Sequence, residues 1–471
     1  MPPDDWSRRD VHRALLGTLV AGCAPRGSAT GDTDVLTDTD GPAASGRPRA
    51  VILITADDLG WKDVGAYGLD LVATPALDRL VAEGATFDRA FDVTSTCSSS
   101  RATYATGQYP HTHGVTGLVH RHPELSLPSS RPHLARSFQD AGWATALQGK
   151  WHLSQTEQPQ AFGYDEHLPT EVDQLIRTSD AARAFLEQHR DGGFFLELNF
   201  MQTHRIPLVE TLPQEPGFEV DEGIASPPAW WGLPDLPAVR TEVAGYMSRL
   251  AWMDALIGEV LDALDDLGLA DDTLVAFVSD NGPPFAGLKL TLYDRGTGTP
   301  LMFRWPAGLT PQRTDALWSS VDLAPTLLDL AGLPPLEGAQ GRSWRPFLEE
   351  GGPFALPEAI FSEMEQHGGP LPARAVRTAT HKYVVNLSDK PWGGAGQGWK
   401  DEVMDLPGQT WDEPRPREEL YDLTADPLER TNLVDDPGSS AVLADLRARL
   451  AAHLAASEDP RAGDVAARQA G

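Results

Sequence analysis

Four apolar runs constrain the fold of this chain more than any other feature of its sequence. Residues 51–56 and 274–278 are continuously apolar, and residues 143–147 and 194–200 are nearly so. Strands that are buried on both faces of a parallel sheet have this pattern. Longer amphipathic stretches separate the runs, so the sequence predicts an α/β fold with a large, mainly parallel sheet flanked by helices.

Polar side chains follow each of these runs within five residues. They are Asp57 and Asp58, Lys150 and His152, Thr203 and His204, and Asp280 and Asn281. Because ligands bind at the carboxyl ends of the strands in open α/β sheets, we expect these residues to form one composite site. Taken singly, the aspartate pair also fits a helix cap or a turn, and Asp-Asn-Gly is a common turn sequence.

The oxygen atoms at these strand ends point to a divalent cation. Asp57, Asp58 and Asp280 offer carboxylates, and Asn281 offers an amide oxygen. This set suits Ca²⁺ or Mg²⁺ better than Zn²⁺, which favours His and Cys, and Ca²⁺ tolerates irregular coordination best. The pair His111 and His113 could bind zinc in principle, but after a proline it fits a structured turn better.

The run Cys97-Ser98-Ser99-Ser100-Arg101 is the most distinctive short segment. The chain has only two cysteines, and this one stands at the expected start of a helix, four residues before an arginine. Free backbone N–H groups and a nearby cation favour anions at such a position. The alternative is that Cys97 is only a small buried apolar residue.

Charge excludes one class of partner. The 471 residues include 68 acidic and 38 basic ones, for a formal net charge of -30. Binding of nucleic acid needs a basic face, so nucleic acid is not an expected partner. An anionic substrate would be repelled at long range and needs local cations in a cleft. Two of the six lysines, Lys150 and Lys289, lie in motifs of the expected site.

The N-terminus predicts export. Residues 1–23 fit a twin-arginine lipoprotein-type signal peptide: Arg8-Arg9 precedes a short apolar stretch that ends at Cys23, as in a lipobox. We expect the twin-arginine export machinery as a partner, and a lipid anchor at Cys23 that holds the protein to a membrane in the periplasm or at the cell surface. The alternative is an ordinary disordered leader with a chance arginine pair.

Composition predicts the division of the remaining chain. Residues 24–48 read as a flexible linker, 49–345 as the catalytic domain, 346–456 as a C-terminal subdomain and 457–471 as a disordered tail. The subdomain is expected to hold a small antiparallel sheet and a helix over 440–456, with leucines on one face. Residues 390–417 are expected to be a long loop that roofs the site.

Read in order, these motifs resemble the type I sulfatases of the alkaline phosphatase superfamily. The resemblance runs from Val51 to Leu433. It rests on Thr55-Ala56-Asp57-Asp58-Leu59-Gly60, Thr74-Pro75-Ala76-Leu77-Asp78-Arg79-Leu80, the Cys97 run with Thr106-Gly107, Gly149-Lys150-Trp151-His152, Ser279-Asp280-Asn281-Gly282 and Glu419-Leu420-Tyr421-Asp422-Leu423. It implies an alkaline phosphatase/sulfatase-like fold with a smaller C-terminal subdomain.

The resemblance also implies a chemistry. The cysteine would be oxidised to formylglycine, whose hydrated aldehyde is the nucleophile, and Ca²⁺ would activate it. The implied metal ligands are Asp57, Asp58, Asp280, Asn281 and the oxidised residue 97. Arg101 and Lys150 would hold the hydrate, His152 would take its proton, Lys289 would bind the sulfate oxygens and His204 would protonate the leaving group.

One position departs from the family pattern. Ser99 stands where the maturation signal usually has Pro or Ala. A formylglycine-generating maturation enzyme is an implied partner, and this serine puts its action on Cys97 in question. Arg101 and Thr106-Gly107 are retained, so we expect an active enzyme.

Loop motifs indicate the substrate class. Leu118-Val119-His120-Arg121-His122, Thr203-His204-Arg205 and Arg374-Ala375-Val376-Arg377 resemble the heparan N-sulfatase (sulfamidase) branch. This implies a sulfated sugar, N- or O-sulfated glucosamine, with aryl sulfates as a further class. The alternatives are a phosphonate or phosphodiester hydrolase of the same superfamily, and a non-catalytic lipoprotein that binds sulfated glycans.

Overall fold

The computed structural model describes residues 46–169, 177–205, 214–350, 354–367, 369–391 and 413–470. Residues 45–471 form a compact unit. The predicted signal peptide with Cys23, nearly all of the linker and most of the predicted roof loop lie outside the described residues. The boundary expected at 345/346 falls at the start of a helix, Arg345–Glu350 (α10), and stays a prediction.

A sheet of eight strands carries the predicted site residues. Its order is β4 (Glu166–Pro169), β3 (Ala144–Gly149), β5 (Phe194–Phe200), β1 (Ala50–Ala56), β6 (Thr273–Ser279), β7 (Leu301–Arg304), β2 (Ala85–Phe91) and β8 (Gln312–Ser319). Only β7 runs antiparallel to its neighbours. The four predicted strands are β3, β5, β1 and β6, which are consecutive in the sheet, so the predicted α/β fold is confirmed.

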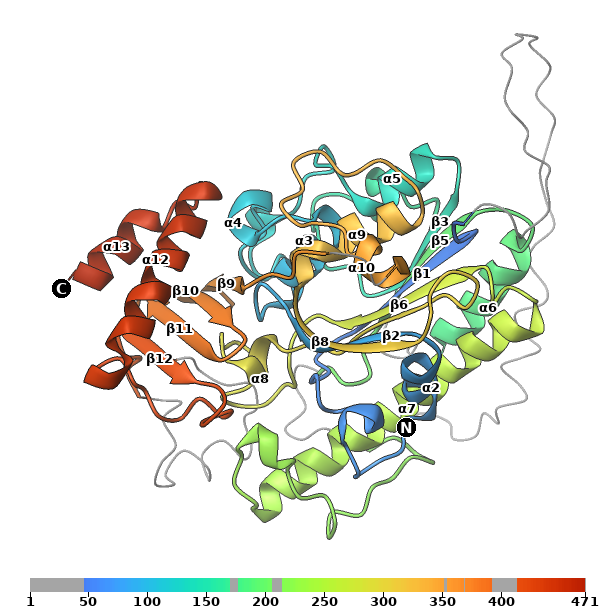
Figure 1. Cartoon of the computed structure of the whole chain (residues 1–471). Helices are drawn as coiled ribbons and strands as arrows, with labels where there is room; N and C mark the ends of the chain where they lie inside the picture. The colour runs from blue at the N-terminus through green and yellow to red at the C-terminus, as the bar shows by residue number, and fades with distance from the viewer. Residues whose placement is uncertain are drawn as a thin grey trace, which may run out of the picture. The chain divides into compact units, whose positions relative to one another are not determined.

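Helices cover both faces of this sheet (Figure 1). Ile52 and Ile54 of β1 belong to a core with α2 (Pro75–Glu83), α6 (Arg177–His189) and α7 (Pro237–Asp266). Val51 and Leu53 point to the other face, where they pack in a core with α3 (Cys97–Thr106), α5 (Leu134–Asp140) and α9 (Leu323–Leu330). Burial on both sides explains why β1 is apolar at every position except Thr55.

The strands that carry the site end at the same level. Ala56 is paired with Phe200 of β5 and with Ser279 of β6, and Gly149 of β3 is paired with Asn199. The residues that follow these strands therefore emerge side by side at one edge of the sheet.

A second sheet lies in the C-terminal part. It is antiparallel in the order β12 (Glu418–Asp422), β11 (His381–Asn386), β10 (Pro370–Thr378), β9 (Ala359–Gln366). Helix α12 (Ser440–Ala456) packs on it through Leu443, Leu446, Leu450 and Leu454, as the sequence predicted. A short helix α8 (Asp294–Thr297) connects the two regions, since Arg377 of β10 forms an ion pair with Asp294 at 2.9 Å.

The prediction of a disordered tail over 457–471 is wrong for most of that segment. Residues Ala462–Ala470 form helix α13, and Val465 is buried in the core of the small sheet and α12. Gln469 also donates a hydrogen bond to the hydroxyl of Tyr383 at 3.1 Å. Val465 is the only large apolar side chain of this helix and the other apolar ones are alanines, so the segment carries little periodic signal and the sequence did not indicate this docking.

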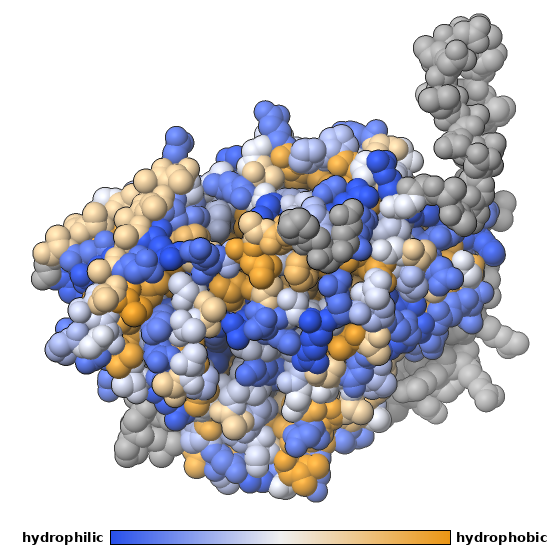
Figure 2. All heavy atoms as spheres, viewed as in Figure 1, coloured by the Kyte–Doolittle hydropathy of each residue, from blue (hydrophilic) through white to orange (hydrophobic). Residues whose placement is uncertain are grey.

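Hydrophilic residues cover much of the face shown in Figure 2, with apolar patches between them. No helix in the described part of the chain combines the length and the apolar character that a membrane span requires.

A buried ionic network joins the C-terminal part to the segment after α3. His111, in the short helix α4 (Pro110–His113), contacts Glu363 of β9 through Nδ1 at 2.5 Å and lies near Asp459 at 3.6 Å. Arg374 donates to both carboxylate oxygens of Asp459. Burial alone would lower the pKa of His111, but the hydrogen bond and the charge of Glu363 outweigh it and raise that pKa.

The substitution His111→Gln should destabilise the protein most where His111 is protonated. Because the pKa is raised in the folded state, the stabilisation is complete below about pH 6.5 and is lost as pH rises through the folded pKa. We expect a loss of about 1–2 kcal/mol in the free energy of unfolding at pH 6, measured by denaturant titration, and a smaller loss at higher pH.

His453→Gln is the matched control. Burial lowers the pKa of His453 to about 4, so its contribution has the opposite sign of pH dependence: it grows as pH rises from about 4 to about 6.5 and is complete above that. A destabilisation by His111→Gln that does not change with pH would contradict the assignment of a protonated His111.

Candidate active site

A strained turn after β1 presents the two predicted aspartates. Asp58 has a φ of 68°, in the left-handed region that a non-glycine residue rarely adopts. The backbone N–H of Asp58 donates to Oδ1 of Asp280 at 3.1 Å, and the hydroxyl of Thr203 donates to the carbonyl of Asp57 at 2.7 Å. The neighbouring strands thus hold the turn in place.

Tyr246 of α7 supports the same turn through its hydroxyl group. Its hydroxyl accepts a hydrogen bond from the N–H of Gly60 at 3.2 Å and lies 2.8 Å from Oδ2 of Asp63 and 3.3 Å from the carbonyl of Asp58. The indole of Trp231 donates to the other oxygen of Asp63 at 3.0 Å. Burial raises the pKa of Asp63 to about 8, against these hydrogen bonds.

Gly149 lets the third strand end close to its neighbour. It has a φ of 99°, and a Cβ at this position would lie 2.1 Å from the carbonyl oxygen of Asn199. Only glycine fits this approach without strain. The chain can then turn and carry Lys150 to the carboxylate of Asp57, where its Nζ lies 2.5 Å from Oδ2.

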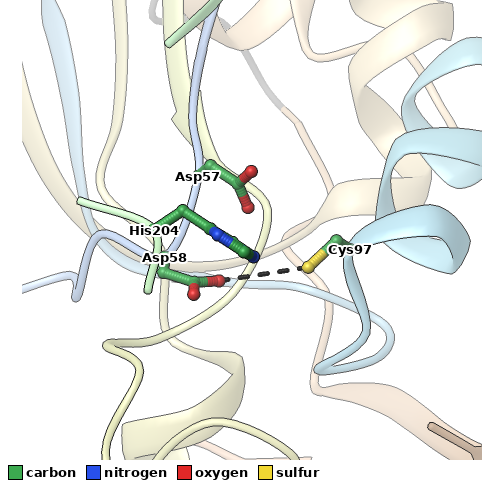
Figure 3. A group of neighbouring side chains, drawn as sticks. All are labelled: Asp57, Asp58, Cys97 and His204. Atoms are coloured by element: carbon green, nitrogen blue, oxygen red, sulfur yellow. Dashed lines mark hydrogen bonds between the residues drawn. The ribbon is translucent and has the colours of Figure 1, made fainter. Parts of the chain in front are cut away.

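Cys97 faces the aspartate turn from the start of α3. It is 1% exposed, and its Sγ lies 3.5 Å from Oδ1 of Asn281 and 4.0 Å from Oδ1 of Asp58. Lys289 bridges the two sides, with its Nζ 3.1 Å from Sγ and 2.5 Å from Oδ1 of Asp58. Figure 3 shows Asp57 and Asp58, from one turn, together with Cys97 and His204, from two other segments, pointing toward one another.

Burial controls the ionisation of the thiol. Desolvation raises the pKa of Cys97 to about 12, despite the nearby ammonium groups of Lys150 and Lys289. An unmodified Cys97 is therefore a protonated thiol at neutral pH and a poor nucleophile, because the thiolate is the reactive form.

Cations and carboxylates are matched in this site. Arg101 donates through Nε to Oδ2 of Asp280 at 2.9 Å, next to the pairs of Lys150 with Asp57 and Lys289 with Asp58. Burial would raise the pKa of Asp57, but Lys150 and the other cationic groups hold it well below its usual range. Burial and the repulsion of Asp57 raise the pKa of Asp280 to about 7.

Two carboxylate oxygens in the site lack a hydrogen-bond partner among the described residues. Asp57 Oδ1 and Asp58 Oδ2 are buried and have no hydrogen-bond partner among the described residues. Ligand atoms of Asp57, Asp58, Cys97 and His204 all lie within 4.8 Å of one another. Buried oxygens without partners are costly, and a hard divalent cation would satisfy them, so the residues fit the predicted Ca²⁺ or Mg²⁺.

Histidines complete the site. Burial lowers the pKa of His204 to about 4, more than the nearby Asp57 and Asp58 raise it, so its ring is neutral at pH 7. His152 is 8% exposed, and its Nε2 lies 2.8 Å from Nδ1 of His120, with the two rings stacked. The Nδ1 of His152 is buried without a partner in the described part of the chain.

The geometry confirms that the predicted residues converge, and it adds others. All ten predicted residues lie in this one site, within hydrogen-bond, ion-pair or close electrostatic reach of another member: Asp57, Asp58, Cys97, Arg101, Lys150, His152, His204, Asp280, Asn281 and Lys289. The pairing of His120 with His152 and the support by Tyr246 were not predicted. Tyr246 lies in a helix that is buried on most sides, so no periodic pattern marked it.

Comparison with known proteins agrees with this geometry. The "Sulfatase" family model matches residues 49–333. The chain belongs to the sulfatase family. A second model, "N-sulphoglucosamine sulphohydrolase, C-terminal", matches residues 288–390 of this sulfatase. The chain is 32% identical to the human (Homo sapiens) N-sulphoglucosamine sulphohydrolase, over 88% of this chain and 91% of that protein.

One further relative and two solved structures extend the comparison. The sulfatase is 25% identical to an N-acetylgalactosamine-6-O-sulfatase of Bacteroides thetaiotaomicron, over 81% of this chain and 89% of that protein. Among solved structures, one in complex with its substrate D-glucosamine-2-N,6-O-disulfate has a TM-score of 0.68 at 22% identity, covering 88% of this chain and 99% of the other. A 2-O GAG sulfatase has a TM-score of 0.67 at 23% identity, covering 88% and 93%.

Proposed function

We propose that this sulfatase removes sulfate from N- or O-sulfated glucosamine at the end of a glycan, using a formylglycine made from Cys97 and a bound Ca²⁺. The convergence of Cys97, Asp58, Asn281 and Lys289 carries the proposal, because a hard cation and an anionic group at residue 97 fit that arrangement. The match of the C-terminal part to N-sulphoglucosamine sulphohydrolase and the identity to the human enzyme support the substrate class.

The cation and the aldehyde supply the electrophilic and nucleophilic chemistry. Ca²⁺, when bound by Asp57, Asp58, Asp280, Asn281 and residue 97, would withdraw electrons from the sulfate group and favour the deprotonated aldehyde hydrate. The two unpartnered carboxylate oxygens support this ligand set. Mg²⁺ is the alternative ion, but it demands a stricter octahedral geometry.

Cationic side chains stabilise the anionic groups. Lys289 lies 3.1 Å from Sγ of residue 97 and would bind sulfate oxygens there. Lys150 and Arg101 pair with Asp57 and Asp280 and would hold the hydrate of residue 97. In a chain with a net charge of -30, this cluster of cations supplies the local attraction that a sulfate requires.

The histidines transfer protons. His204 would protonate the nitrogen or oxygen of the sugar as its bond to sulfur breaks, and the charge of a bound sulfate favours the protonated ring. His152 would take the proton of the hydrate through its unpartnered Nδ1. His120 would act as a positioning residue, because its contact with Nε2 leaves Nδ1 free and fixes the ring.

Location is part of the proposal. The twin-arginine motif, the apolar stretch and Cys23 support export and a lipid anchor at the periplasmic or outer cell surface. A mature protein that begins at an acylated Cys23 is the expected observation in the native host, and retention of residues 1–22 would exclude it.

A panel of substrates tests the proposed reaction. We expect hydrolysis of N-sulfoglucosamine with kcat/KM at least tenfold above that of an aryl sulfate, and little turnover of a phosphodiester. The variant His204→Gln should lower kcat on the sugar about 10²- to 10⁴-fold, the usual contribution of general acid catalysis. A preference for the phosphodiester would instead indicate a diester hydrolase of the same superfamily.

Mass spectrometry of the peptide that contains residue 97 tests the nucleophile. In protein from the native host we expect an aldehyde in place of the thiol, despite Ser99. The variant Cys97→Ser, in a host without an enzyme that oxidises serine, should lose all turnover and keep its melting temperature. An intact thiol in an enzyme that turns over sulfate esters would exclude formylglycine as the nucleophile.

Calcium binding should stabilise the wild-type protein. At a concentration of Ca²⁺ one hundred times Kd, we expect about 2.7 kcal/mol of added stability, seen as a rise in melting temperature. Asp280→Asn should abolish most of this rise, because it removes a carboxylate that lies against the aspartate turn.

Asp445→Asn is the matched control for this measurement. Asp445 is an exposed residue of α12 that pairs with Arg449, so its loss should leave the calcium-dependent rise unchanged. Equal stabilisation by Ca²⁺ in Asp280→Asn and in the wild type would exclude this site for the ion.

A further inference from the structure

One cavity in the described part of the chain is lined by none of the ten predicted site residues. Its volume is about 760 Å³, within the range of small-molecule sites. The segment after the aspartate turn contributes Trp61 and Lys62, β8 contributes Arg313, and the turn after β12 contributes Leu428. The cavity therefore lies between the β2–β8 end of the large sheet and the small sheet.

Two half-buried tryptophans give this cavity flat apolar walls. Trp61 packs edge to face against Phe91 at 5.5 Å, which fixes its ring. Trp230 likewise meets Trp231 at 6.1 Å. Both line the cavity. Rigid indole rings that are partly exposed offer the stacking surface that sugar rings bind.

The cavity also holds two cations that form no ion pair within 4.0 Å among the described residues. Lys62 has its Nζ 4.7 Å above the Trp61 ring, and no carboxylate of the described residues lies within 4.0 Å of it. Arg295 is 8% exposed; its Nη1 donates to the carbonyl of Trp231, and its Nε has no hydrogen-bond partner among the described residues. Burial lowers the pKa of both Lys62 and Arg295, more than Asp294 or Glu429 raises it.

Other charged groups in the cavity are already paired. Arg377 forms an ion pair with Asp294 at 2.9 Å, and Arg313 with Asp88 at 2.8 Å. Lys62 and Arg295 are therefore the cations of the cavity that could form an ion pair with a bound anion. Cations without an ion pair beside fixed aromatic rings are unexpected in a chain with a net charge of -30 unless an anion binds there.

We propose that this cavity binds an anionic saccharide unit, with its sulfate or carboxylate on Lys62 and Arg295 and its ring against Trp61 or Trp230. The inference rests on the proposed function only for the kind of glycan: the unit would belong to the same class of sulfated chain on which the enzyme acts. The site is a binding site and takes no part in the chemistry at residue 97.

Calorimetric titration with a heparin-type octasaccharide tests the proposal on the full chain. The Cys97→Ala background prevents turnover and leaves the cavity intact. Lys62→Glu should weaken binding of the octasaccharide about five- to tenfold, since it replaces a charge-assisted contact by repulsion. Trp61→Leu should weaken it about threefold or more through the lost stacking. Lys62→Ala serves if Lys62→Glu lowers the melting temperature.

Arg190→Glu is the matched control. Arg190 is an exposed residue directly after α6, which packs on β3 and β5 at the other end of the sheet, and the substitution changes the net charge equally. We expect it to change the Kd less than twofold. Equal effects of Lys62→Glu and Arg190→Glu would overturn the proposal, because only long-range charge would then matter.

Inorganic sulfate separates a saccharide site from a simple anion site. If sulfate at the same concentration of sulfate groups displaces the octasaccharide fully from the Lys62-dependent site, the saccharide assignment is overturned. Because the titration measures binding and not hydrolysis, failure of this proposal can be told apart from failure of the proposed function. Lys62-dependent binding without any sulfate hydrolysis would refute only the function, and hydrolysis without Lys62-dependent binding would refute only this inference.

Discussion

The active site depends on parallel strands that end at the same level, and on the strained turn that follows the central one. A left-handed conformation at a residue such as Asp58 costs about 1–2 kcal/mol. Hydrogen bonds from Thr203 and to Asp280, together with the buried hydroxyl of Tyr246, offset this cost. Lys150 and Lys289 in turn reach the carboxylates that this turn presents.

The charge balance of the site follows from the same arrangement. Each carboxylate at the strand ends has a cation beside it, yet Asp57 and Asp58 each keep one oxygen without a partner in the described chain. The site can thus accept a divalent cation and still hold an anionic substrate nearby. An enzyme with a strongly negative surface repels anions at long range, so it needs cations within the site to attract an anionic substrate.

The sequence predicted what local patterns encode. Continuous apolar runs identified β1, β3, β5 and β6, and the polar residues after them identified the site, because parallel strands bring their carboxyl ends together. It did not predict contacts between remote segments whose sequence is unremarkable, such as Tyr246 under the turn, His111 with Glu363, or Val465 in the small core. The cavity beside Lys62 also needs two sheets to form, so no single motif indicates it.

The segment before Cys97 is held in the folded protein by hydrogen bonds with residues that lie far along the chain and are synthesised later. The N–H of Val93 donates to the hydroxyl of Ser320, 227 positions further along, and its carbonyl accepts from the N–H of Glu363 in β9. The hydroxyl of Thr96 contacts Met364 of the same strand. These contacts can therefore form only after β9 has been synthesised, and until then the segment before Cys97 lacks the partners that bury it in the finished fold.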